Sequence, residues 1–152
     1  MDKSVYIGVI GAGECSKSTY EHARDVGFQI GGKGWIMVCG GLGGVMEGAA
    51  KGCVEAGGMT VGILPGLVRE SANRFIKLSL PTGLGEGRNL LVVRSSDFLI
   101  SIAGGYGTLS EIALALKMDK PVIGLETWKE IKGIYYVSDA DEAIHKICEL
   151  KA

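Results

Sequence analysis

The sequence predicts an α/β fold in which helices cover both faces of a parallel sheet, within a single domain over residues 1–152. Short apolar runs rich in β-branched residues recur along the chain, and continuous runs of this kind suit strands covered on both faces. Segments of helical length separate the runs, which favours right-handed crossovers between parallel strands. A chain of 152 residues also fits one domain with one core.

These two patterns assign the elements in chain order. The apolar runs predict strands at residues 5–10, 35–39, 60–64, 98–103 and 121–125. Segments of helical length lie at residues 16–26, 45–56, 88–95 and 109–118, and a last helix over 139–150 closes the fold. The helix expected from Leu109 has the clearest period, because Ile112, Ala113 and Leu116 complete one buried face.

Residues 65–87, PGLVRESANRFIKLSLPTGLGEG, are the least regular part of the chain and have room for one more strand over 75–80. Open parallel sheets bind ligands beyond the carboxyl ends of their strands, where the strand order reverses. We therefore expect this loop-rich segment to cover a ligand.

The charge balance argues against nucleic acid or an anionic membrane as a partner, because the formal net charge is -1. Basic residues are nevertheless in local excess between residues 69 and 94. They are Arg69, Arg74, Lys77, Arg88 and Arg94, against Glu70 and Glu86. This stretch suits either an anionic ligand or a solvated basic face.

Neither a metal site nor a membrane span is predicted. The cysteines, Cys15, Cys39, Cys53 and Cys148, form no CxxC motif and have no histidine partners at zinc-ligand spacing, so we expect buried or idle thiols. The start of the chain lacks the apolar stretch of a signal peptide, and no apolar run is long enough to cross a bilayer. We expect a cytoplasmic protein.

The segment FLISIAGGYGT at residues 98–108 is a strand that enters a glycine-rich turn just before a helix. Small residues let a ligand approach the backbone, and a helix N-terminus offers free N–H groups to an anion such as phosphate. Two other strands also end in glycine, and the carboxyl ends of parallel strands lie along one edge. We therefore predict one shared phosphate site, made by Gly11, Gly13, Gly40, Gly41, Gly43, Gly44, Gly104, Gly105, Gly107 and Thr108.

Two better-known nucleotide motifs are not matched. The first turn has Ser16 where a dinucleotide fingerprint needs glycine or alanine, and the second strand ends without an acidic residue for a ribose hydroxyl. The segment from Gly27 to Lys33 nearly spells a Walker A loop. However, it continues with Gly34 in place of Ser or Thr, and it precedes a strand.

Two side chains near the predicted edge are candidates for chemistry. Glu111 fits a capping box with Thr108, a spacing that recurs at Thr127 and Glu130, although its carboxylate could instead orient a water or a sugar hydroxyl. Arg88 is either a surface arginine or a guanidinium that pairs with a phosphate or with Glu111.

Three segments together resemble the Rossmann-like family often labelled "lysine decarboxylase-like". They are GGLGGVM from Gly40, GEGRN from Gly85 and GGYGTLSE from Gly104. The best-known members are the lonely-guy cytokinin-activating phosphoribohydrolases and the molybdenum cofactor carrier proteins. The sequence has no motif that identifies a lysine for binding pyridoxal phosphate, so a lysine decarboxylase is not predicted.

In the phosphoribohydrolases, a PGGxGTxxE motif and a preceding arginine cleave a nucleoside monophosphate into base and ribose 5-phosphate. The resemblance implies that Glu111 and Arg88 are catalytic if this chain is an enzyme. Three positions depart from the hydrolases: Ala103 replaces proline, Asn89 replaces the usual lysine, and Ser110 replaces a frequent acidic residue. The departures favour the carrier-like branch, whose members bind the pterin phosphate of the molybdenum cofactor.

These observations leave three functions open. The first is a binding protein for a phosphate-bearing nucleotide or pterin, which requires no cofactor and takes molybdenum cofactor or a nucleotide as its ligand. The alternative is an N-glycosidase in which Glu111 stabilises an oxocarbenium-like transition state. A third is a structural or sensory partner that binds a nucleotide signal. The resemblance also implies a homodimer or a larger homo-oligomer.

Overall fold

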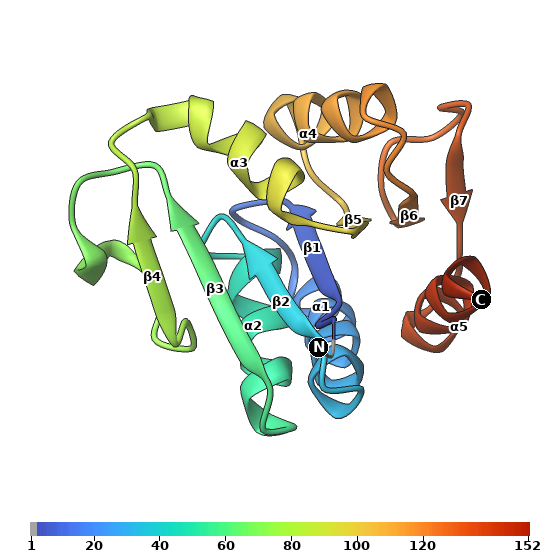
Figure 1. The fold of residues 1–152 in the computed structure, drawn as a ribbon, viewed down its shortest axis with the longest axis horizontal. Coiled ribbons are helices and arrows are strands. Elements are labelled where there is room, and N and C mark those ends of the chain that lie inside the picture. The colour runs from blue at the N-terminus through green and yellow to red at the C-terminus, as the bar shows by residue number, and fades with distance from the viewer. Residues whose placement is uncertain (1–2) are drawn as a thin grey trace.

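The computed structural model describes residues 3–152, which form one seven-stranded sheet with every neighbouring pair parallel (Figure 1). The strands are β1 (Tyr6–Gly11), β2 (Ile36–Cys39), β3 (Met59–Leu64), β4 (Leu78–Pro81), β5 (Phe98–Ile102), β6 (Val122–Leu125) and β7 (Ile134–Tyr136). Their order across the sheet is β4-β3-β2-β1-β5-β6-β7. The chain builds outward from β1 to one side and then from β5 to the other, so the strand order reverses between β1 and β5.

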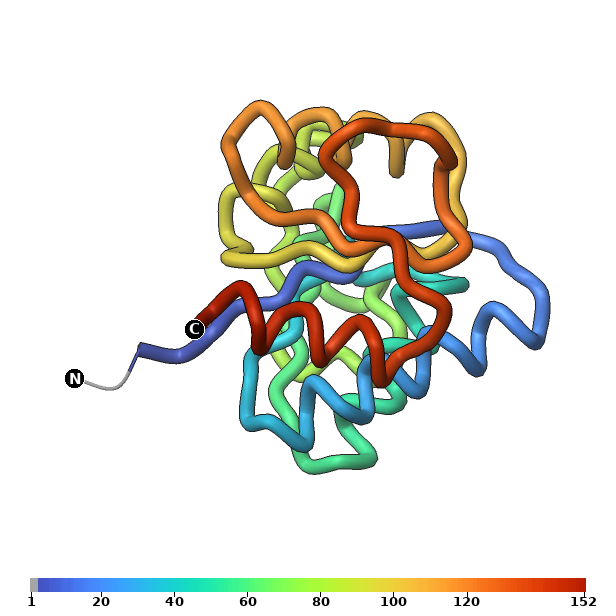
Figure 2. Tube along the Cα trace, turned by 90° about the vertical axis from the view of Figure 1, so that its right-hand side faces the viewer, coloured from blue at the N-terminus to red at the C-terminus, as the bar shows by residue number. Residues whose placement is uncertain are grey.

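Helices cover both faces of this sheet. They are α1 (Lys17–Gly32), α2 (Val45–Glu55), α3 (Arg88–Ser95), α4 (Tyr106–Lys117) and α5 (Ala140–Lys151). Figures 1 and 2 show α3 and α4 above the sheet and α1, α2 and α5 below it. Each layer buries its own apolar cluster against the strands. The prediction of a single parallel α/β domain is therefore confirmed.

Two elements differ from the sequence-based assignment. The extra strand expected over 75–80 forms as β4, Leu78–Pro81. β7 was not predicted, because it has only three residues at the edge of the sheet and two of them are exposed, which leaves too short an apolar signal. Between residues 3 and 152, no helix combines the length and the apolarity that a membrane span requires.

Helix α1 continues six residues beyond its predicted end at residue 26, because its glycines serve packing and do not end the helix. A Cβ at Gly27 would lie 1.8 Å from the Ala49 carbonyl oxygen, and one at Gly52 would lie 1.9 Å from the Arg24 carbonyl oxygen. Helices α1 and α2 therefore approach each other closely through glycines on both sides. The near-match to a Walker A loop falls at the end of α1, which agrees with its exclusion as a nucleotide loop.

The irregular segment after β3 holds in place the second glycine turn, which is residues 40–44 after β2. The backbone N–H of Asn73 donates to the Gly41 carbonyl oxygen at 2.9 Å, and its side-chain amide donates to the Leu42 carbonyl oxygen at 2.8 Å. These bonds link residues that are far apart in the sequence. The segment thereby supports one wall of the site described next.

Candidate ligand-binding site

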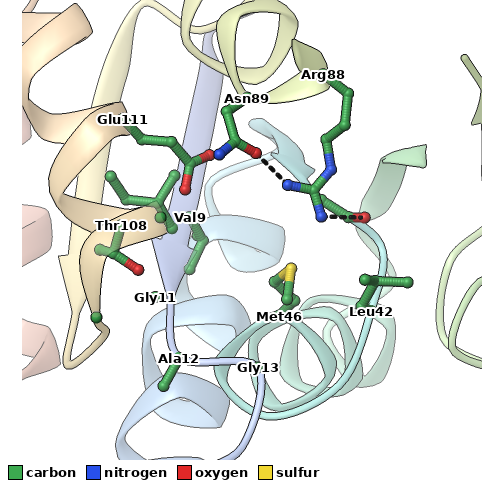
Figure 3. A pocket seen from close by; sticks show the side chains of 14 residues that line it. Val9, Gly11, Ala12, Gly13, Leu42, Met46, Arg88, Asn89, Thr108 and Glu111 are labelled. Carbon is green, nitrogen blue, oxygen red and sulfur yellow. Dashed lines mark hydrogen bonds between the residues drawn. The ribbon is translucent and has the colours of Figure 1, made fainter. Parts of the chain in front are cut away.

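A cavity of about 290 Å³ opens at the carboxyl edge of the sheet, beside the point where the strand order reverses (Figure 3). Strand ends, glycine turns and the first turns of three helices make its walls. The lining residues are Val9, Ile10, Gly11, Ala12, Gly13, Gly40, Leu42, Met46, Arg88, Asn89, Gly105, Gly107, Thr108 and Glu111. A cavity at this place is where ligands bind in open α/β sheets.

Part of the predicted glycine set lines the cavity directly: Gly11, Gly13, Gly40, Gly105 and Gly107. At position 40 a Cβ would lie 2.6 Å from Nη2 of Arg88 and 2.9 Å from the Met46 sulfur, so a larger residue there would displace these two side chains. Gly40 therefore leaves the space that the guanidinium occupies.

The other predicted glycines, Gly41, Gly43, Gly44 and Gly104, are not among the lining residues. Gly44 has a φ of 63° and Gly104 a φ of 104°, which glycine tolerates better than other residues. A Cβ on Gly104 would also lie 2.2 Å from Oγ1 of Thr108. These two glycines shape the turns that carry the lining residues.

Helix α4 presents its N-terminus to the cavity. It begins at Tyr106 with Gly105 as the N-cap, and among the described residues no side chain caps it. Gly105, Gly107 and Thr108 all line the cavity. The first N–H groups of a helix have no partner within it, so this end suits an anion.

The predicted capping box is wrong. α4 begins earlier than expected, so Thr108 already lies in its first turn and Glu111 one turn further along. Both side chains are buried and line the cavity. The same spacing at Thr127 and Glu130 caps no helix either, because both residues lie in the irregular loop between β6 and β7.

Glu111 is a buried acid, only 7% exposed. Burial raises its pKa from the ordinary value of 4.5 to about 7, against the opposing effect of the Arg88 charge. Figure 3 shows its carboxyl group pointing towards the amide of Asn89. Near neutral pH this carboxyl is therefore present in both protonation states.

Arg88 begins α3 and reaches over the second glycine turn. Nη1 donates a short hydrogen bond to the side-chain oxygen of Asn89, and Nη2 donates to the Gly40 carbonyl oxygen at 3.5 Å (Figure 3). Its Nε is buried and has no partner among residues 3–152. Within the described part of the chain, Arg88 forms no ion pair with Glu111. Its guanidinium therefore keeps bonding capacity for a ligand.

Sequence reasoning missed most of the apolar wall and Asn89. Val9, Ile10, Leu42 and Met46 give the cavity aliphatic sides, and in sequence such residues cannot be told from core residues. Asn89 is only 8% exposed, and a buried polar side chain needs a hydrogen-bond partner. Its position next to Arg88 in the sequence was the one signal that it could be a site residue.

A family model described as the SLOG cluster4 family matches residues 4–150. An uncharacterised protein of Archaeoglobus fulgidus is 47% identical over 143 residues, which are 94% of each chain. A cytokinin riboside 5′-monophosphate phosphoribohydrolase of Mycobacterium tuberculosis is 32% identical over 126 residues, 75% of this chain and 66% of the hydrolase. The solved molybdenum cofactor binding protein of Rippkaea orientalis has a TM-score of 0.94 and 34% identity over 99% of both chains. The resemblance to both groups is thus confirmed.

Proposed function

This chain belongs to the SLOG cluster4 family, and we propose that it is a binding protein for a phosphate-bearing pterin or nucleotide. The observation that carries the proposal is that Arg88 and the uncapped N-terminus of α4 line the same cavity. A guanidinium and a helix N-terminus both bind phosphate well, and both can do so without a catalytic group nearby.

The geometry of the third glycine turn, which is residues 103–107 after β5, supports binding over cleavage. Ala103, which occupies the place of the hydrolase proline, has a φ of 52°. Proline holds φ near about -65°, so a proline at this position would require a different backbone path into the turn. The likeness to a solved molybdenum cofactor binding protein supports a pterin phosphate as the ligand.

Replacement of Arg88 tests the proposal. We expect Arg88→Ala to weaken binding of a pterin phosphate or of adenosine 5′-monophosphate roughly tenfold or more, because a charge-assisted contact contributes about 1.5 to 3 kcal/mol. Isothermal titration calorimetry measures the change. Arg94→Ala is the matched control, since Arg94 is exposed near the other end of the same helix. Unchanged affinity in Arg88→Ala removes Arg88 from the site.

One observation favours the second candidate, a nucleoside 5′-monophosphate phosphoribohydrolase. Glu111 lines the cavity with a pKa raised by burial to about 7, and a carboxyl that titrates near neutrality suits general acid–base chemistry. It would stabilise positive charge on the ribose and orient water, with Arg88 and the α4 N-terminus on the phosphate. Release of free base by wild type but not by Glu111→Gln supports this candidate, and full turnover in that variant excludes the mechanism.

A homo-oligomer is the second part of the proposal. On the side of α3 and α4, a hollow of about 430 Å³ runs over β2, β3 and β4. Among the described residues, none of those that line this hollow is charged. Met59, Leu78 and Leu80 are about half exposed. A second copy related by a two-fold axis would place one such apolar surface against another. The cytoplasmic location stays a prediction.

A further inference from the structure

We propose that Tyr106 and Trp128 form a stacking platform at the mouth of the cavity for the planar ring of the ligand, whether a purine or a pterin. This inference rests on the proposed binding function. It adds the part of the site that recognises the heterocycle, whereas Arg88 and the α4 N-terminus account for the phosphate.

Inside the cavity, the planar ring of a ligand would find none of the described aromatic side chains to stack on. The cavity volume of about 290 Å³ is just below the range of ligand pockets, which span about 300 to 1,000 Å³. Among residues 3–152, the side chains that line it are aliphatic, polar or charged, and none is aromatic. A ligand whose phosphate meets the polar walls therefore has room to extend its ring beyond the mouth.

Tyr106 belongs to the turn that lines the cavity. It stands between Gly105 and Gly107, both of which line the cavity, and it is 83% exposed. Packing in the core does not explain an aromatic side chain at this position, because the side chain is mostly in solvent. Trp128 lies next to it, with the ring centroids 5.8 Å apart and the planes tilted by 35°. Trp128 is itself partly buried against the apolar cluster, so it supports the exposed ring of Tyr106 beside the cavity turn.

Hydrogen bonds fix this pair to the phosphate turn. Nε1 of Trp128 donates to the Gly105 carbonyl oxygen at 3.0 Å. The hydroxyl of Thr127 donates to the Ala103 carbonyl oxygen at 3.0 Å, and the hydroxyl of Tyr136 donates to the Trp128 carbonyl oxygen at 2.5 Å. The loop after β6 is therefore tied by side-chain hydrogen bonds to the turn after β5, which holds the platform next to that turn.

Such a platform recognises the face of a heteroaromatic ring without reading its hydrogen-bonding edge. Stacking of a base on an aromatic side chain contributes about 1 to 3 kcal/mol, or about 5- to 150-fold in affinity. It would accept either a purine or a pterin, because both offer a flat π face.

The test compares ligands with and without a ring. Binding of adenosine 5′-monophosphate, a pterin phosphate and ribose 5-phosphate is measured by calorimetry in wild type, Tyr106→Ala and Tyr106→Phe, with intact ligand verified by chromatography. We expect Tyr106→Ala to weaken the two ring-bearing ligands about fivefold or more and to leave ribose 5-phosphate unchanged. Tyr106→Phe retains wild-type affinity, and Tyr135→Ala, at an exposed tyrosine on β7, is the control.

The outcomes separate the two proposals. If wild type binds a ring-bearing ligand and Tyr106→Ala binds it equally well, or loses ribose 5-phosphate to the same extent, the platform is overturned and the binding function stands. If wild type binds none of the three ligands, the binding function is overturned and the platform with it.

Discussion

Burial of Glu111 gives this protein a carboxyl group that responds to pH near neutrality. The side chain lies in the cavity wall beside Asn89, within the influence of the Arg88 charge. The pKa of Glu111 rises because the effect of desolvation is larger than the opposing effect of the Arg88 charge. The protonation state of Glu111 thus couples the charge of the site to the stability of the fold.

The pH dependence of stability tests this coupling. The folded state holds the Glu111 proton more tightly than the unfolded state, with a pKa of about 7 against 4.5. The stabilisation is fully present below 4.5 and is lost as the pH rises through about 7. We expect wild type to lose up to about 3 kcal/mol relative to Glu111→Gln between about pH 5 and pH 8.

Urea unfolding of both proteins at the two pH values measures this loss. Glu86→Gln, at an exposed position before α3, should follow wild type. If the stability of Glu111→Gln falls with pH as steeply as that of wild type, Glu111 is not the titrating group.

Lys120 is a second single side chain with a defined task. Its Nζ donates to the carbonyl oxygens of Val93 at 2.8 Å, Arg94 at 2.8 Å and Ser96 at 2.6 Å, at the C-terminus of α3. Helix C-termini favour a positive charge. We expect Lys120→Met to reduce the free energy of unfolding by about 1 to 3 kcal/mol. Chemical denaturation checks this against Lys132→Met, an exposed lysine; an equal effect of the two would contradict the assigned role.

The start of α4 decided how well the site could be predicted from the sequence. Helical periodicity records only the buried face, so the pattern began at Leu109, whereas Tyr106 and Gly107 in the first turn are exposed and left no apolar signal. Shifting the helix start changed Thr108 and Glu111 from a predicted capping pair into buried cavity residues. By contrast, α3 was predicted with its observed bounds, so Arg88 was placed at the start of the helix from the sequence.

The contact between α1 and α2 gives a test with a built-in control. Gly27→Ala should destabilise the protein by several kcal/mol although alanine favours helices, because its Cβ would lie 1.8 Å from the Ala49 carbonyl oxygen. Gly32→Ala, in the same helix with no atom within 4 Å of the added Cβ, should be neutral or stabilising by up to about 1 kcal/mol. Thermal unfolding compares the two; similar effects would contradict close packing of these helices.

The sheet as a whole was predictable because alternating apolar runs and helical segments permit few topologies, and parallel pairing brings the strand ends to one edge. That reasoning brought Gly11, Gly40 and Gly105 to one place, and all three line the cavity. It could not show which apolar residues face the cavity, or that β3 and β4 expose apolar side chains on the α3 side. Both depend on where the helices settle across the sheet.

The exposed face of β3 and β4 predicts the assembly state. Parallel sheets are normally covered on both faces, yet Leu78 is 50% and Leu80 45% exposed. We expect wild type to be a homo-oligomer and the double variant Leu78→Lys, Leu80→Lys to dissociate, because it would bring like charges together in an apolar contact. Size-exclusion chromatography with light scattering measures the mass. Phe28→Lys, on α1 across the sheet, should keep the wild-type mass; a monomeric wild type would refute the proposal.

Native mass spectrometry of the protein after incubation with a pterin phosphate and with adenosine 5′-monophosphate, followed by chromatography for released base, tests the binding function most directly. The account predicts that wild type retains an intact ligand, that Arg88→Ala retains less of it, and that no base is released. Free base that disappears in Glu111→Gln, or no retained ligand at all, would contradict it.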